Sequence, residues 1–201
     1  NAPEGQKVEA EEAKAPAAAT AGQTYSVDTN KSMVTWTGTK PTGSHTGTLN
    51  LSDGDLTVMD GKLMGGTFVL DMNSIKNTDL PAEKKGDLEG HLKNEDFFEV
   101  EKYPTGKFVV TEVKAGSATE GATHDITGNL TMKGQSKSVT IPANVNVNET
   151  TITAVTPAFT IDRTEWGITY KSGAVGTIKD NLINDEIGLV LQLVAVADPV
   201  Q

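Results

Sequence analysis

The chain has 201 residues, a formal net charge of -10 at pH 7 and no cysteine. The acidic balance argues against nucleic acid and anionic membrane surfaces as bulk partners, because both repel a negatively charged protein. The lack of cysteine excludes disulfides, thiolate catalysis and cysteine-ligated zinc. No apolar run approaches the roughly 20 residues that a membrane-spanning helix needs.

The first segment, residues 1–24, is rich in Ala, Glu and Pro, and Val8 is its only large apolar residue. Such a composition buries too little apolar surface to offset the entropy of ordering, so we expect a disordered linker. A flexible linker suits a tether between an anchor and a domain, and a frayed terminus is the alternative. Residues 25–198 are then the expected folded domain.

From Tyr25 the chain shows the two-residue alternation of half-buried strands. Residues 32–40 and 45–51 are two predicted strands, and the polar run 52–55 is predicted to turn the chain back. Asp60-Gly61 is the signature of a two-residue hairpin.

One helix is predicted over residues 81–93, where Leu88 and Leu92 lie four positions apart and share a face. The adjacent aromatic residues Phe97 and Phe98 follow it. Because nearly all other segments alternate with a period of two, this helix is expected to act as a plug at one end of a β structure.

The second half of the chain again predicts strands, separated by turn signals, over residues 108–113, 123–132, 138–147, 151–159 and 187–196. The last of these is apolar on both faces, so it is expected to be central in the sheet or covered on both sides. Many short strands at this spacing indicate a sandwich or barrel, and closure would remove exposed edges. We therefore predict an all-β fold, an antiparallel barrel of about eight strands.

Several motifs resemble, in order and spacing, those of the YceI-like family: MVTW at 33–36, SHTG at 44–47, HLKNEDFFEVEKYP at 91–104, GNLTMKG at 128–134 with Ile141-Pro142, and IDRTEWG at 161–167. The resemblance covers roughly Tyr25 to Ala197, with Trp166 where the family often has Phe. It implies an extended eight-stranded antiparallel barrel shaped like a lipocalin. It also implies an exported bacterial protein, and some members of the family hold a polyisoprenoid chain inside the barrel.

The leading hypothesis is therefore non-catalytic binding, carriage or sequestration of a long apolar isoprenoid-like lipid. An eight-stranded barrel has room for its own side chains or one slender ligand, and each buried methylene contributes ~0.8 kcal/mol. The expected ligand-binding residues are Trp36, His45, Phe68, Leu70, Leu92, Phe97, Phe98, Phe108, Val110, Leu130, Phe159, Ile161, Arg163, Trp166, Leu189 and Leu191.

Each assignment has an alternative. The apolar residues could fill an ordinary core, because alternation does not tell which face points inward. Arg163, the only arginine, could contact a pyrophosphate or headgroup, or form an ion pair that fixes a strand end. His45 could meet a ligand at the barrel mouth or be a surface hydrogen-bonder. No metal ligand is expected, since the acidic runs lack a calcium-loop register. No catalytic residue is expected either, since nothing in the spacing of the carboxylates argues for a catalytic pair.

Other functions remain open: a secreted module with a solid core, a hydrolase, or an outer-membrane barrel with its apolar residues outward. No cofactor is expected beyond a bound isoprenoid lipid or quinone-like molecule. The expected location is the periplasm or the cell exterior, with a membrane tether if a lipidated cysteine precedes Asn1. Homodimerisation is also left open.

Overall fold

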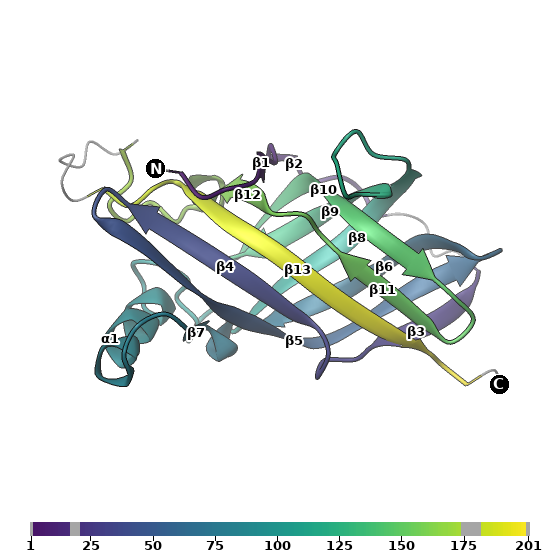
Figure 1. Ribbon diagram of the computed structural model, residues 1–201, viewed down its shortest axis with the longest axis horizontal. Coiled ribbons are helices and arrows are strands. Elements are labelled where there is room, and N and C mark those ends of the chain that lie inside the picture. Colours follow the sequence, from purple (N-terminus) through teal and green to yellow (C-terminus); the bar gives the residue numbers. More distant parts are fainter. Residues whose placement is uncertain (1, 17–20, 174–181, 200–201) are drawn as a thin grey trace.

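The computed structural model describes residues 2–16, 21–173 and 182–199, and within them the sheet closes into a ring of eight strands (Figure 1). The prediction of an all-β antiparallel barrel with one helix is confirmed. Neighbouring strands in the ring are antiparallel, and the pairing of β13 with β4 closes it. In ring order the strands are β4 (Met33–Lys40), β5 (Gly43–Met59), β6 (Lys62–Asp71), β8 (Thr105–Ala115), β9 (His124–Met132), β10 (Gln135–Val147), β11 (Thr151–Val155) and β13 (Glu186–Ala197).

Two-residue turns join several of these strands. Asp60 and Gly61 have φ angles of 52° and 72° between β5 and β6, and Lys133 and Gly134 have φ angles of 47° and 74° between β9 and β10. Positive φ at both central residues matches the right-handed twist of a hairpin. The hairpin predicted at Asp60-Gly61 is confirmed.

The predicted turn at residues 52–55 is wrong, because β5 continues through it. A register shift between Leu51 and Asp53 marks a β-bulge, and Gly54 has a φ of 156°. A bulge bends a strand without ending it. The first part of β5 therefore pairs with β4, and its later part pairs with β3 (Gln23–Val27).

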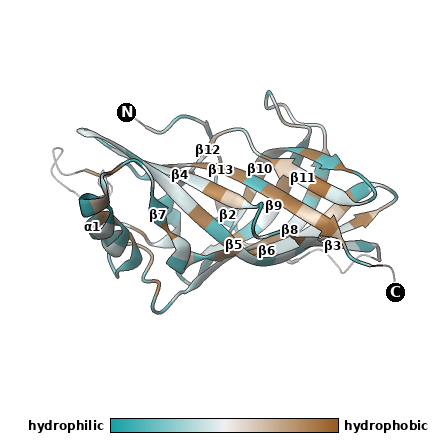
Figure 2. Cartoon of the chain, turned by 60° about the horizontal axis from the view of Figure 1, so that its bottom comes forward, coloured by the Kyte–Doolittle hydropathy of each residue, from teal (hydrophilic) through white to brown (hydrophobic). Residues whose placement is uncertain are grey.

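The predicted helix is confirmed as α1 (Ala82–Lys93), which lies at one end of the barrel (Figure 1). It is mostly hydrophilic, whereas the strands alternate in hydropathy along their length (Figure 2). Two 3-10 helices, η1 (Met72–Ser74) and η2 (Arg163–Trp166), and the short strand β7 (Lys76–Asn77) lie between strands. Among the described residues no helix is long and apolar enough to cross a membrane.

The N-terminal segment differs from the disordered linker expected for residues 1–24. β1 (Gln6–Lys7) pairs in parallel with β12 (Phe159–Asp162), and β2 (Glu11–Glu12) pairs antiparallel with β10. Val8 between them is 5% exposed and belongs to the main apolar cluster. The backbone pairing of β1 and β2 and the burial of Val8 hold this segment against the barrel, which its composition alone does not predict. Residues 1 and 17–20 of the predicted linker lie outside the described residues.

We call residues 6–12 the strap. It crosses the barrel surface between β10 and β12 (Figure 1). β10 pairs with β11 only over Asn144–Val147. The earlier part of β10 faces β12 on this side, and the described residues of the two strands do not pair with each other. The strap pairs with both strands across this opening. It therefore completes the barrel wall on that side.

The last strand was expected to be central in the sheet or covered on both sides, and it is central, because β13 pairs with β4 and β3 along one edge and with β11 and β12 along the other. Its outer face is not fully covered. The inward-facing Leu193 and Ala195 are 2% and 0% exposed, but the outward-facing Val196 is 42% exposed. A closed barrel buries one face of each strand and leaves the other at the surface. Val196 is therefore a surface residue, whereas Val190 and Val194 on the same face are half-buried.

Candidate ligand-binding site

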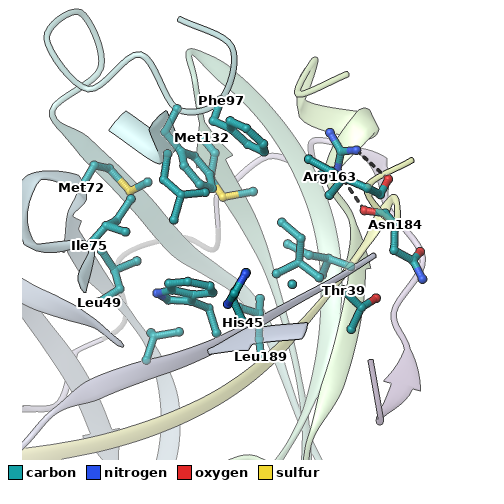
Figure 3. Close-up of a pocket in the computed structure, with 18 of the residues that line it drawn as sticks. Thr39, His45, Leu49, Met72, Ile75, Phe97, Met132, Arg163, Asn184 and Leu189 are labelled. Carbon is teal, nitrogen blue, oxygen red and sulfur yellow. Dashed lines mark hydrogen bonds between the residues drawn. The ribbon is translucent and has the colours of Figure 1, made fainter. Parts of the chain in front are cut away.

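A cavity of about 530 Å³ lies inside the half of the barrel next to α1. Inward-facing side chains of most barrel strands surround it, and α1, η1 and the segments before β13 border it (Figure 3). The described lining residues are Val34, Trp36, Gly38, Thr39, Lys40, Thr42, His45, Leu49, Phe68, Leu70, Met72, Ile75, Leu88, His91, Leu92, Phe97, Phe98, Phe108, Leu130, Met132, Ile141, Phe159, Ile161, Arg163, Tyr170, Lys171, Leu182, Ile183, Asn184, Ile187, Leu189 and Leu191. A lining of this apolar character suits a hydrophobic ligand.

The structure brings most of the expected residues together around this cavity. The expected residues on its wall are Trp36, His45, Phe68, Leu70, Leu92, Phe97, Phe98, Phe108, Leu130, Phe159, Ile161, Arg163, Leu189 and Leu191. Two are not on it, Val110 and Trp166. The structure therefore places most of the expected residues on the inward face of their strands, whereas the sequence did not show the level along the barrel at which the cavity ends.

Trp166 and Val110 have structural positions. Trp166 in η2 is 0% exposed, and its indole Nε1 donates a hydrogen bond to the Leu130 carbonyl oxygen at 2.9 Å. Val110 is 5% exposed and lies two residues beyond Phe108 on β8, within the packed part of the barrel. Both residues support the wall without facing the cavity.

Two stacked rings lie at the inner end of the cavity, where they are the innermost lining residues of β6 and β8. Phe68 on β6 and Phe108 on β8 are register partners, with ring centroids 5.2 Å apart and an interplanar angle of 23°. A Cβ at Gly128 on β9 would lie 2.4 Å from Phe108 Cζ, so only glycine leaves space for this ring. We call this ring pair the floor.

The opposite end of the cavity is its mouth, next to α1. His91 of α1 lies edge-on to Phe97 and Tyr170, with centroid separations of 5.1 and 4.9 Å. His91 Nε2 also lies 3.0 Å from an Asp96 carboxylate oxygen. These contacts join the end of α1 to the segment after η2. The expectation that Phe97, Phe98 and Leu92 lie at one end of the barrel agrees with this placement.

His45, also at the mouth, belongs to a hydrogen-bonded network around Asp79. His45 Nδ1 lies 3.0 Å from Asp79 Oδ2, and the Thr46 backbone N–H and the Asn77 amide donate to the same carboxylate. Burial acts to raise the pKa of Asp79, but these hydrogen bonds outweigh it and hold the pKa below its ordinary value. The network fixes β7 against β5.

Arg163 is 1% exposed, and its contacts are those of a structural residue. Its Nε donates to Asn184 O at 3.0 Å (Figure 3). Nη1 donates to Ile168 O at 2.7 Å, and Nη2 donates to Ile183 O at 3.0 Å. Asp185 Oδ1 lies 3.3 Å from Nη2. Burial lowers the pKa of Arg163, whereas the negative charge of Asp185 acts to raise it. A guanidinium nevertheless stays protonated at any ordinary pH. Arg163 was expected either to contact a ligand headgroup or to form an ion pair that fixes a strand end, and these contacts agree with the second interpretation.

The charged groups of the lining are basic. Lys40 and Lys171 are exposed at the mouth, and no described lining residue is Asp or Glu. Across the described parts of the chain, no group of three or more His, Asp or Glu residues could hold a metal ion. The cavity therefore offers apolar contact along its length and positive charge at its mouth.

Some lining residues were not among those expected from the sequence. Met132 shares the inward face with Leu130 on β9, and Met72 continues the alternation of Phe68 and Leu70, so alternation could have identified both. Ile75 follows η1 and Tyr170 follows η2, where no two-residue period exists. Only the tertiary structure places these two residues.

Comparison with known proteins identifies one family. Residues 25–195 match the family described as the YceI-like domain. A UPF0312 protein of Pseudomonas putida is 36% identical over 100 residues, which are 50% of this chain and 48% of that protein. A UPF0312 protein of Pseudomonas aeruginosa is 44% identical over 69 residues, 34% of each chain. The chain thus spans about half or less of the length of these curated relatives.

Solved structures share the fold. Burkholderia cenocepacia BcnA has a TM-score of 0.66 and 22% identity, covering 84% of this chain and 99% of that chain. A polyisoprenoid binding domain from Saccharophagus degradans, implicated in plant cell wall breakdown, has a TM-score of 0.61 and 18% identity, covering 87% of this chain and 98% of that chain. At these identities the likeness concerns the fold.

Proposed function

The chain belongs to the YceI-like domain family, and on this premise we propose that it binds and carries a long apolar isoprenoid-like chain inside its barrel, without catalysis. The observation that carries the proposal is the cavity of about 530 Å³ with its apolar lining. The fold similarity to a polyisoprenoid binding domain supports it. A barrel with a solid core throughout does not describe this structure, because the half next to α1 contains the cavity.

The affinity expected for such a ligand follows from the area that it buries. About ten methylene-sized groups taken from water contribute about 8 kcal/mol, which corresponds to a dissociation constant of about 1 μM. Ordering the ligand lowers this gain, and additional buried groups raise it. A neutral prenyl chain therefore needs no charged contact to bind.

The two tryptophans of the chain make a direct test. Trp36 lines the cavity and Trp166 does not, so Trp166→Phe leaves a single indole that reports on the cavity. Titration of this variant with geranylgeraniol is expected to change its emission saturably. Trp36→Phe, which keeps only Trp166, is the control and is expected to show a much smaller change.

Organic extraction of the purified protein followed by mass spectrometry tests for a ligand acquired in the cell. We expect a prenyl lipid or quinone-like molecule in the extract. Extracts without any such lipid from several bacterial hosts, together with unchanged Trp36 emission on titration, would overturn the proposal.

The proposal extends to location, in the periplasm or outside the cell, with a lipid anchor if a lipidated cysteine precedes Asn1. Its support is the resemblance to a family of exported bacterial proteins. Fractionation of the native host with an antibody against the protein checks it. Recovery in the cytoplasm would contradict it.

A further inference from the structure

We propose that the floor, formed by Phe68 and Phe108, sets the length of the apolar chain that the cavity accepts. This inference rests on the proposed function, because it concerns the ligand of the same cavity. Three features of the structure carry it: the level at which the lining stops, the polarity of the two ends, and the packing of the ring pair.

The lining stops at one level on separate strands. On β8 Phe108 lines the cavity, whereas Val110, the next residue on the same face, is buried and does not. On β13 Leu191 lines it, whereas Leu193 is 2% exposed and does not. Since these strands are not neighbours in the ring, the boundary crosses the barrel interior.

The polarity of the two ends gives the ligand one orientation. The mouth carries the exposed residues Lys40, Thr42 and Lys171, whereas the inner end is formed by aromatic rings. A polar head at the inner end would lose its hydration without a hydrogen-bond partner, which is costly. The apolar tail therefore enters first, and its terminal methyl groups reach the floor.

The floor is held firmly enough to act as a stop. Phe108 is 2% exposed and Phe68 is 8% exposed, and the two rings stack on each other. The close approach of Phe108 to Gly128 fixes the ring against β9. In a close-packed interior such a ring cannot move aside without displacing its neighbours.

The available depth can be estimated from β4. Val34 lines the inner part of the cavity and Lys40 its mouth, so six residues of extended strand separate the two levels. At the rise of a strand this is about 20 Å, and strand tilt reduces it to about 15 Å along the barrel axis. Any part of a chain beyond this depth stays in water, and its burial contributes nothing to affinity.

The test measures affinity along a series of prenols of increasing length, from geraniol through farnesol and geranylgeraniol to longer polyprenols. The readout is Trp36 emission, with Trp166→Phe as the common background. For the parent protein we expect the affinity to rise with each isoprene unit and then to level off. In Phe108→Ala one of the two rings of the floor is removed, so the plateau is expected at a longer prenol, with a gain on the order of tenfold for the first added unit.

Val110→Ala is the matched control, because Val110 is buried on the same strand face but lies beyond the floor. It is expected to destabilise the barrel without moving the plateau. Phe108→Leu is a milder second variant, if Phe108→Ala does not fold, and its plateau is expected to move in the same direction.

Three outcomes would contradict the inference or its premise. If Phe108→Ala and Phe108→Leu bind prenols with the same plateau as the parent, the length-setting role of the floor is wrong, although lipid binding stands. If Val110→Ala moves the plateau as much as Phe108→Ala, the effect comes from general loosening, and the role is again wrong. If no prenol binds the parent protein, the proposed function itself fails, and the length-setting role fails with it.

Discussion

The two halves of the barrel are built from the same strands but are filled differently. In the half next to α1, the inward side chains surround the cavity. In the other half Tyr25, Ile152, Leu193 and Ala195 are each 2% exposed or less, and the Tyr25 hydroxyl donates to Asn148 O at 3.0 Å. The alternation is the same in both halves, so the side chains present at each level decide which half is hollow. Stability should therefore depend mainly on the solid half, and ligand capacity on the hollow half.

The largest expected effect tests this division directly. Ile152→Ala removes a fully buried side chain in the solid half and should lower the free energy of unfolding by about 4 kcal/mol. Ile187→Ala makes the same change on the cavity wall, where the side chain is partly exposed, and should cost about 1 kcal/mol. Urea denaturation followed by circular dichroism measures both. Equal losses would remove the distinction.

Arg163 should be an exception to the division between a solid half that sets stability and a hollow half that sets ligand capacity. It borders the hollow half, yet Arg163→Met should cost about 3 kcal/mol, because three carbonyl groups and Asp185 lose their buried partner. The exposed ion pair between Lys137 and Glu165, 3.3 Å long, gives the control. Lys137→Ala should change the free energy by about 0.5 kcal/mol or less. A similar small change for Arg163→Met would show that the buried guanidinium is dispensable.

The strap sharpens the comparison, because its anchor belongs to the packed core although it lies outside the family match. Val8→Ser should lower the free energy of unfolding by about 2 kcal/mol, through lost apolar burial and an added buried hydroxyl. Lys7→Ser changes an exposed neighbour within the strap and should be nearly neutral. Thermal denaturation of the two variants separates these expectations. Equal melting temperatures would mean that Val8 does not anchor the strap.

The smallest expected effect is the pH dependence at the mouth. The pKa of Asp79 lies below its ordinary value of 3.8, so its ionised form stabilises the fold above that pH, and the contribution is lost as the pH falls through the lowered pKa. Asp79→Asn should therefore cost less than about 1 kcal/mol at pH 7 and nothing well below pH 3. Urea titrations at both pH values give the difference. A loss that grows on acidification would reverse the sign and contradict the assignment.

The strand pattern and the family motifs were enough to predict the barrel, the helix and most of the cavity wall. What they lacked was the level of each residue along the barrel axis, because a two-residue period distinguishes faces but not depth. Val110 and Trp166 were misplaced for this reason: one lies beyond the floor, and the other makes its hydrogen bond within the wall.

Residues outside the periodic segments were the other source of error. Ile75 and Tyr170 reach the cavity from irregular segments whose course depends on tertiary contacts. The strap was assigned as disordered because its composition is polar, yet β10 and β12 offer it unpaired backbone groups. The pairing of the strap depends on the free edges of β10 and β12, so the sequence of the strap alone does not predict it.

That pairing has a practical consequence for how the protein is produced. A recombinant version trimmed to the family boundaries, 25–195, would keep the strands of the ring, apart from the last two residues of β13, but lack residues 6–12. Its β10 and β12 would then present open edges, which recruit strands from other molecules. Such a truncated protein should self-associate at concentrations where the full chain stays monodisperse, so the smallest well-behaved unit is larger than the family boundaries suggest.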